Sequence, residues 1–111
     1  NNQKISVNLL IKSNNSTKWH NNTKIKLGKS MFELTQQVTQ VEYQEFSFGV
    51  YVNAIDGLKG GALRNQHWIW WTWIDGSGWS KGQVGSEYYK LRDGSIVAWV
   101  FQGGNSNQTP T

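Results

Sequence analysis

The chain has 111 residues, no cysteine, and eleven basic against seven acidic side chains. This length suits a single domain, and the lack of cysteine excludes a disulfide framework, a thiolate nucleophile and a cysteine-ligated metal. No apolar run approaches the roughly 18 residues of a membrane-spanning helix. The sequence starts at Asn1 without an initiator Met or a signal peptide, so we expect a processed, mature chain.

Two features of the composition point to a surface protein. The chain carries seven Trp, four Tyr and four Phe, together with eleven Asn and nine Gln. This aromatic and uncharged polar character is less typical of a metabolic enzyme, so we expect an extracellular or cell-surface location. Four Asn residues fit the acceptor pattern for N-glycosylation, namely Asn14, Asn15, Asn21 and Asn107.

The charge is unevenly distributed, because the first thirty residues carry six Lys and no acid. A basic segment beside aromatic strands is one way to bind single-stranded nucleic acid. Here the Lys residues alternate with Asn and Ser on the solvent side of a predicted strand, far in sequence from most of the Trp residues. We therefore interpret the basic segment as a solvated edge and do not expect nucleic-acid binding.

Residues 4–12 alternate apolar and polar side chains, which predicts a strand with one buried face. The apolar set is Ile5, Val7, Leu9 and Ile11. A second strand is predicted over residues 18–27, after a polar loop. Ser30 and Glu33 then form a capping box, and apolar residues follow it at helical spacing, which predicts one helix. These helical positions are Met31, Leu34, Val38 and Val41.

From Tyr43 the period returns to two, which predicts a strand with Phe46, Phe48, Val50 and Val52 on one face. Three Asp-Gly pairs, at 56–57, 75–76 and 93–94, predict tight turns, because both residue types tolerate positive φ. Between the turns we expect strands over residues 67–74, about 86–91 and 95–101.

This order of elements predicts an α+β fold in which a lone helix packs across a mostly antiparallel sheet. We expect one domain over residues 1–102 and a polar, flexible tail over residues 103–111. One helix covers only one face of a sheet, so the opposite face is open unless another body covers it. If the smaller residues of the last strand face the helix, the open face carries Trp71, Trp73, Trp99 and Phe101.

The apolar surface area of four such rings exceeds that of the largest apolar patch on an ordinary soluble monomer. Three candidates could cover them: a neighbouring molecule, a small ligand, or a segment of the chain itself. The loop at residues 57–66 and the C-terminal tail are the segments able to do so.

Residues 49–102 resemble the transcobalamin-like C-terminal domain family. The resemblance is carried by an extended strand ending in Ile55-Asp56-Gly57, an aromatic strand ending in Ile74-Asp75-Gly76, and a closing segment that runs from Tyr89-Lys90-Leu91 through Asp93-Gly94 to Trp99. It implies a β-grasp-like fold, a secreted or surface-anchored protein, and a flat ligand such as a corrinoid against the aromatic sheet. In the cobalamin carriers a second, helical domain forms the other half of the site, and these 111 residues contain no such domain.

The titratable residues do not suggest catalysis. The two histidines, His20 and His67, are isolated in sequence, and three of the seven acids precede glycine in predicted turns. Residues 75–78 lack the spaced carboxylates of a calcium loop, so we interpret them as a turn. We expect a non-enzymatic protein without a metal or a cofactor.

Two functions remain open. The first hypothesis is a subunit of an extracellular fibre or layer that self-assembles through the aromatic face and a donor strand. In that mode Ile5, Val7, Leu9 and Ile11 fill a groove at the sheet edge of a neighbouring copy, and repeated contacts of this kind give a filament. The alternative is a secreted ligand-binding module for a corrinoid or a carbohydrate that stacks on the Trp-rich face.

Overall fold

The computed structural model describes residues 3–61 and 65–111. In chain order the elements are β1 (Lys4–Lys12), β2 (Thr17–Lys26), α1 (Met31–Val38), β3 (Val41–Phe46), β4 (Gly49–Ile55), β5 (Leu58–Lys59), β6 (His67–Ile74), β7 (Gly78–Lys81), the 3-10 turn η1 (Ser86–Tyr88) and β8 (Ile96–Gln102). The α+β prediction is confirmed.

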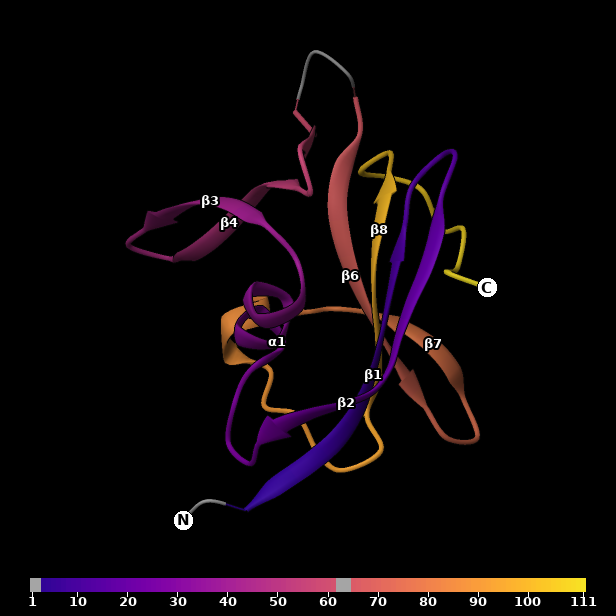
Figure 1. Ribbon diagram of the computed structural model, residues 1–111. Coiled ribbons are helices and arrows are strands. Elements are labelled where there is room, and N and C mark those ends of the chain that lie inside the picture. The colour runs from indigo at the N-terminus through magenta and orange to yellow at the C-terminus, as the bar shows by residue number, and fades with distance from the viewer. Residues whose placement is uncertain (1–2, 62–64) are drawn as a thin grey trace.

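A five-stranded sheet in the order β2-β1-β8-β6-β7 forms the body of the domain (Figure 1). Its pairs are antiparallel except for β1 and β8, which run parallel at its centre. This arrangement of the first and last strands, with α1 packed on one face, is β-grasp-like, as the resemblance implied. The strands β3, β4 and β5 form a separate three-stranded sheet.

The predicted capping box fixes the start of α1. Glu33 N–H donates to Ser30 Oγ over 3.1 Å, and Ser30 N–H donates back to Glu33 Oε1 over 3.0 Å. The bond from Ser30 N–H lowers the pKa of Glu33, because it stabilises the charged carboxylate. The helix ends at Val38, and Val41 belongs to β3, so the prediction that Val41 continues the helix is wrong.

The predicted strand through Phe46, Phe48, Val50 and Val52 is instead a hairpin. Phe46 pairs with Gly49 across a two-residue turn, and the rings of Phe46 and Phe48 stack with centroids 5.0 Å apart. Gly49 has φ +136, a conformation that side-chain-bearing residues avoid. Period-two patterning hid this turn, since the apolar alternation continues through it.

The hairpin is anchored to η1 by Glu87. Val50 N–H donates to Glu87 Oε2 over 2.7 Å. The carboxylate also lies against Gly85, where a Cβ would come within 2.4 Å of Glu87 Oε1. This contact fixes the start of the segment that leads into β8.

The strand predicted at residues 86–91 is wrong, because the chain turns there. Tyr88 N–H donates to Gly85 O, which closes the turn η1. The following residues then lie beside the start of α1: Met31 N–H donates to Tyr89 O, and Leu91 N–H donates to Lys29 O. Residues 88–95 are therefore a connection held against the helix, outside both sheets.

The strand β1 lies inside the sheet of its own molecule, and this gives its predicted role as a donor strand no support. Its backbone pairs with β2 on one side and β8 on the other. Ile5, Val7 and Leu9 are buried in the core of their own molecule, and Ile11 packs against that core. The edges of this sheet are β2 and β7, and β1 has no free edge to offer a neighbour.

The C-terminal tail packs against the sheet, which contradicts the expectation of a flexible end. Pro110 is fully buried, and its carbonyl accepts from Lys12 Nζ over 3.0 Å. Trp79 Nε1–H donates to Thr111 Oγ1, and Lys81 Nζ donates to Ser106 O. In Figure 1 the tail lies on the side of the sheet away from α1.

Candidate ligand-binding groove

The aromatic residues divide between the two faces of the sheet differently from the prediction. Trp99 and Phe101 face α1 and belong to the main core, where they are 3% and 5% exposed. The smaller Ala98 and Val100 face the tail. The expectation that Trp99 and Phe101 lie on an open face is therefore wrong.

The large residues of β8 face α1 because more space has to be filled on the helix side of the sheet than on the tail side. The helix has only eight residues, so large rings are needed to fill the layer between it and the sheet. The Trp99 indole reaches α1, where its N–H donates to Thr35 Oγ1 over 2.7 Å. On the other face the tail bonds to polar side chains of the sheet such as Gln102, and the β8 residues there are the smaller Ala98 and Val100.

Trp71 lies on the second face, as predicted, but the tail covers it and leaves it 4% exposed. Its indole N–H donates to Gln102 Oε1 over 2.8 Å, and Gln102 Nε2 donates to Gln108 O in the tail over 3.0 Å. The ammonium of Lys81 lies 5.4 Å from the centroid of the Trp71 ring, a cation–π distance. Trp71 is thus part of a closed layer and is not available to a ligand.

Trp73 remains partly open. It is 40% exposed and meets Trp79 edge to face, with ring centroids 5.6 Å apart. Within the described residues its indole N–H has no hydrogen-bond partner, whereas the indoles of Trp68, Trp70, Trp71, Trp79 and Trp99 all donate. Of the four predicted aromatic site residues, Trp73 alone keeps an accessible ring and a free donor.

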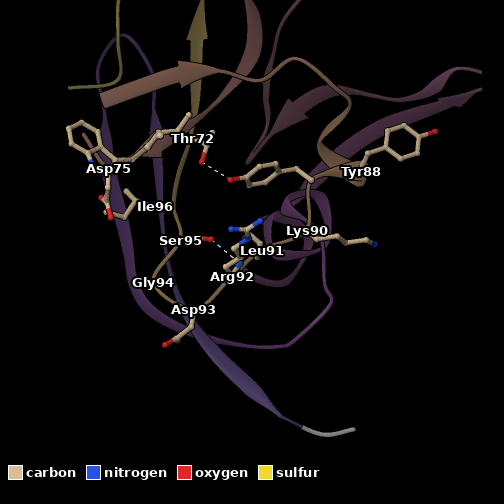
Figure 2. A pocket seen from close by; sticks show the side chains of 13 residues that line it. Thr72, Asp75, Tyr88, Lys90, Leu91, Arg92, Asp93, Gly94, Ser95 and Ile96 are labelled. Atoms are coloured by element: carbon tan, nitrogen blue, oxygen red, sulfur yellow. Dashed lines mark hydrogen bonds between the residues drawn. The ribbon is translucent and has the colours of Figure 1, made fainter. Parts of the chain in front are cut away.

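A groove opens beside Trp73 where two strands diverge. The β6–β8 pairing ends at Thr72 and Val97, whereas β6 continues to pair with β7 as far as Ile74. Residues 88–96 approach β8 from the helix side, which leaves a groove of about 660 Å³ between them and residues 72–75. Figure 2 shows Asp75 and Ile96 at one side of it and Tyr88 and Lys90 at the other.

The groove combines aromatic and polar groups. Tyr89 and Thr72 share a hydrogen bond of 2.9 Å between their hydroxyl oxygens, which holds the Tyr89 ring across the inner end. Tyr88 is 61% exposed at the rim. Two acids and two bases line the groove, so its formal charge is balanced; these residues are Asp75, Asp93, Lys90 and Arg92. Such a lining suits a neutral or zwitterionic ligand with a flat apolar part.

The Asp93-Gly94 end of the groove is fixed to β1. Ser6 N–H donates to Asp93 Oδ1 over 2.9 Å, and Gly94 N–H donates to Ser6 O over 2.7 Å. Arg92 N–H donates to Ser95 Oγ, which closes the Asp93-Gly94 turn. Because the turn is bonded to β1, the groove is pre-formed in this chain.

Sequence reasoning missed Tyr88, Tyr89 and Arg92 as groove residues. One signal pointed to them: two of the three stretches that carry the resemblance, residues 70–76 and 89–99, contribute most of the lining. Their meeting could not be read from the sequence, because it depends on where β6 and β8 part.

The structure shows no metal-binding grouping in the part of the chain that it describes. Within residues 3–61 and 65–111 no three His, Asp or Glu side chains gather to hold a metal ion. Neither histidine lines the groove. His67 Nδ1 lies 2.9 Å from Tyr51 Oη, and burial, aided by Lys18, lowers the pKa of His20. Residues 75–78 form the turn between β6 and β7, with Ser77 N–H donating to Ile74 O.

The four predicted glycosylation residues, Asn14, Asn15, Asn21 and Asn107, are all exposed. They lie in the β1–β2 connection, on β2 and in the tail. Among the described residues there is no helix long and apolar enough to cross a membrane.

Comparison with known proteins gives the fold. No family model matches the sequence, and no curated protein matches it. A solved protein from Ruminococcus gnavus, described as a candidate metal-binding protein, has a TM-score of 0.71 and 11% identity, over 90% of this chain and 98% of its own. Haptocorrin in complex with Cbi has a TM-score of 0.73 and 20% identity over 91% of this chain.

The chain spans only 26% of the haptocorrin chain that it matches. At these identities the likeness shows the fold and not the ligand. It shows that this chain shares its fold with the part of haptocorrin that it matches.

Proposed function

We propose that this domain is a ligand-binding module and that its groove between β6 and residues 88–96 holds the edge of a flat organic ligand, of which a corrinoid is the leading candidate. The observation that carries the proposal is the coincidence of two independent features. Two of the three stretches that resemble the transcobalamin-like family also line the groove.

The geometry supports this ligand class. The volume of about 660 Å³ lies in the range of small-molecule sites, roughly 300–1,000 Å³. Trp73 offers an exposed ring face and an unpaired indole donor. A whole corrinoid has a larger volume than the groove of about 660 Å³, so this domain would contact one side of the ligand and leave its other side to another domain or protein. That arrangement agrees with the half-site that the resemblance implies.

We propose binding without catalysis, because no histidine lines the groove and its acids and bases balance. We also propose an extracellular location, which rests on the exposed sequons and on the resemblance. Self-assembly through a donor strand is not part of the proposal, since β1 is paired on both sides.

Isothermal titration with dicyanocobinamide and with cyanocobalamin tests the proposal. We expect saturable binding of at least one of them, and we expect Trp73→Ala to weaken it at least about fivefold, since an aromatic contact contributes on the order of 1 kcal/mol. Phe48→Ala is the matched control, because Phe48 is 76% exposed at the tip of the β3–β4 hairpin, outside the groove lining.

No heat of binding up to about 1 mM of either corrinoid would reject this ligand class. Binding that Trp73→Ala leaves unchanged would place the ligand outside the groove. If an oligosaccharide binds in a Trp73-dependent way and neither corrinoid does, the ligand class is carbohydrate.

A further inference from the structure

The sequon at Asn21 lies at an irregularity in the backbone of β2. The β1–β2 register shifts between Val7 and Leu9, so Asn21 and Asn22 together oppose Asn8 and form a β-bulge. Asn22 has φ +53, and its N–H donates to Asn8 Oδ1 over 3.1 Å. The bulge lies on β2, which is an edge strand of the five-stranded sheet (Figure 1).

An exposed tryptophan stands two positions before the acceptor. Trp19 is 40% exposed, and within the described residues its indole N–H has no hydrogen-bond partner. Trp19 and Asn21 line one shallow hollow of about 330 Å³, together with Asn8 and Ile96. The main core accounts for Trp68, Trp70 and Trp99, and the cluster on the tail side accounts for Trp71, whereas no buried cluster includes Trp19.

The chemistry of the two side chains is complementary to a sugar. The Asn21 amide nitrogen can take a glycan from a lipid-phosphate-linked donor: the bond from Asn21 Nδ2 to the sugar C1 forms, the C1–O bond to the donor phosphate breaks, and the amide proton leaves. The first sugar is then tethered beside Trp19. The C–H bonds on one face of a pyranose are weakly positive, and they pack against the negative face of an indole ring.

The other three sequons lack this arrangement. The positions two before their acceptors are Lys12, Ser13 and Asn105. The Asn14 amide is also engaged, because it exchanges hydrogen bonds of 3.4 and 3.3 Å with the Gln66 amide. The pairing of an exposed Trp with an acceptor Asn on one bulged strand is therefore particular to Asn21.

We infer that Asn21 is an N-glycan acceptor and that its first sugar stacks on Trp19, which stabilises the folded domain. This inference is independent of the ligand groove, although Ile96 borders both hollows. A glycan at Asn21 then lies beside the groove on its β2 side.

Peptide mass spectrometry of the full chain, secreted from a eukaryotic host, tests the acceptor. Trypsin cuts after Lys18 and Lys24, so the sequon at Asn21 falls in the peptide of residues 19–24, separate from Asn14 and Asn15 in residues 13–18. We expect sugar mass on residues 19–24. If that peptide carries only its unmodified mass, the inference is overturned.

A double-mutant cycle on the unfolding temperature tests the stacking. We expect the glycan to raise the midpoint by roughly 3–6 °C, measured as the difference from Asn21→Gln. This gain should vanish in the Trp19→Ala background, which folds because Trp19 is a partly exposed residue on an edge strand. Asn107→Gln is the matched control, and its effect should not depend on Trp19. A gain at Asn21 that persists in Trp19→Ala contradicts the stacking.

Discussion

Trp99→Ala is expected to destabilise the domain by about 3–5 kcal/mol, the cost of removing a buried indole from a packed core. Trp99 is 3% exposed, and its N–H donates to Thr35 Oγ1 on α1. The substitution therefore removes both the ring between the sheet and α1 and a buried hydrogen bond. Urea unfolding followed by far-UV circular dichroism measures the change.

Trp99→Phe separates the two contributions. It keeps a ring and removes the indole N–H, which leaves the Thr35 hydroxyl donating to Met31 O but accepting nothing from Trp99. We expect a smaller loss of about 1–3 kcal/mol, the cost of an unmade buried hydrogen bond. Phe48→Ala should stay within about 0.5 kcal/mol of the parent chain. A Trp99→Ala variant as stable as that control would show that Trp99 lies on the surface.

Deletion of residues 104–111 is expected to expose Trp71 and to cost about 1–3 kcal/mol. The tail buries Pro110 and covers Trp71, and it is held by bonds from Lys12 Nζ, Lys81 Nζ and Gln102 Nε2. The net effect is modest, because ordering each tail residue costs about 1–2 kcal/mol of backbone entropy. Acrylamide quenching of tryptophan fluorescence should increase in the truncated chain.

The same deletion in a Trp71→Phe background identifies the residue responsible. The increase in quenching should be clearly smaller there, since the tail covers Trp71 through Gln102. The increase that remains is expected from Trp79, whose indole N–H loses its bond to Thr111 Oγ1. If truncation leaves the quenching of the parent chain unchanged, the tail does not cover this face.

The elements with one apolar face could be predicted from the sequence. Alternation places Ile5, Val7 and Leu9 in the core, and the capping box of Ser30 and Glu33 starts the only α-helix of the described residues. These signals are local, because each depends only on neighbours within a few residues.

The orientation of β8 could not be predicted in the same way. Both of its faces are apolar, with Val97, Trp99 and Phe101 on one side and Ile96, Ala98 and Val100 on the other. The choice depends on two distant segments: a short helix that leaves room for large rings, and a tail that fits small residues. Composition also predicted a flexible tail, because its order comes largely from hydrogen bonds to side chains far away in sequence.

The candidate site depends on the same long-range information. Trp73 was predicted as a contact residue, and the structure leaves it exposed, but its partners in the groove come from a connection that was predicted to be a strand. The place where β6 leaves β8 is set by the pairing of β6 with β7 and by the attachment of the Asp93-Gly94 turn to β1. Neither contact has a local sequence signal.

The most direct test of the ligand groove is a nitrogen-15 correlation spectrum of the seven tryptophan indole N–H groups, recorded during titration with dicyanocobinamide. Single Trp→Phe variants assign the signals. The groove predicts that the Trp73 signal shifts most, while those of the buried Trp68 and Trp99 stay in place. A spectrum in which no indole signal moves, or in which Trp19 moves and Trp73 does not, would contradict it.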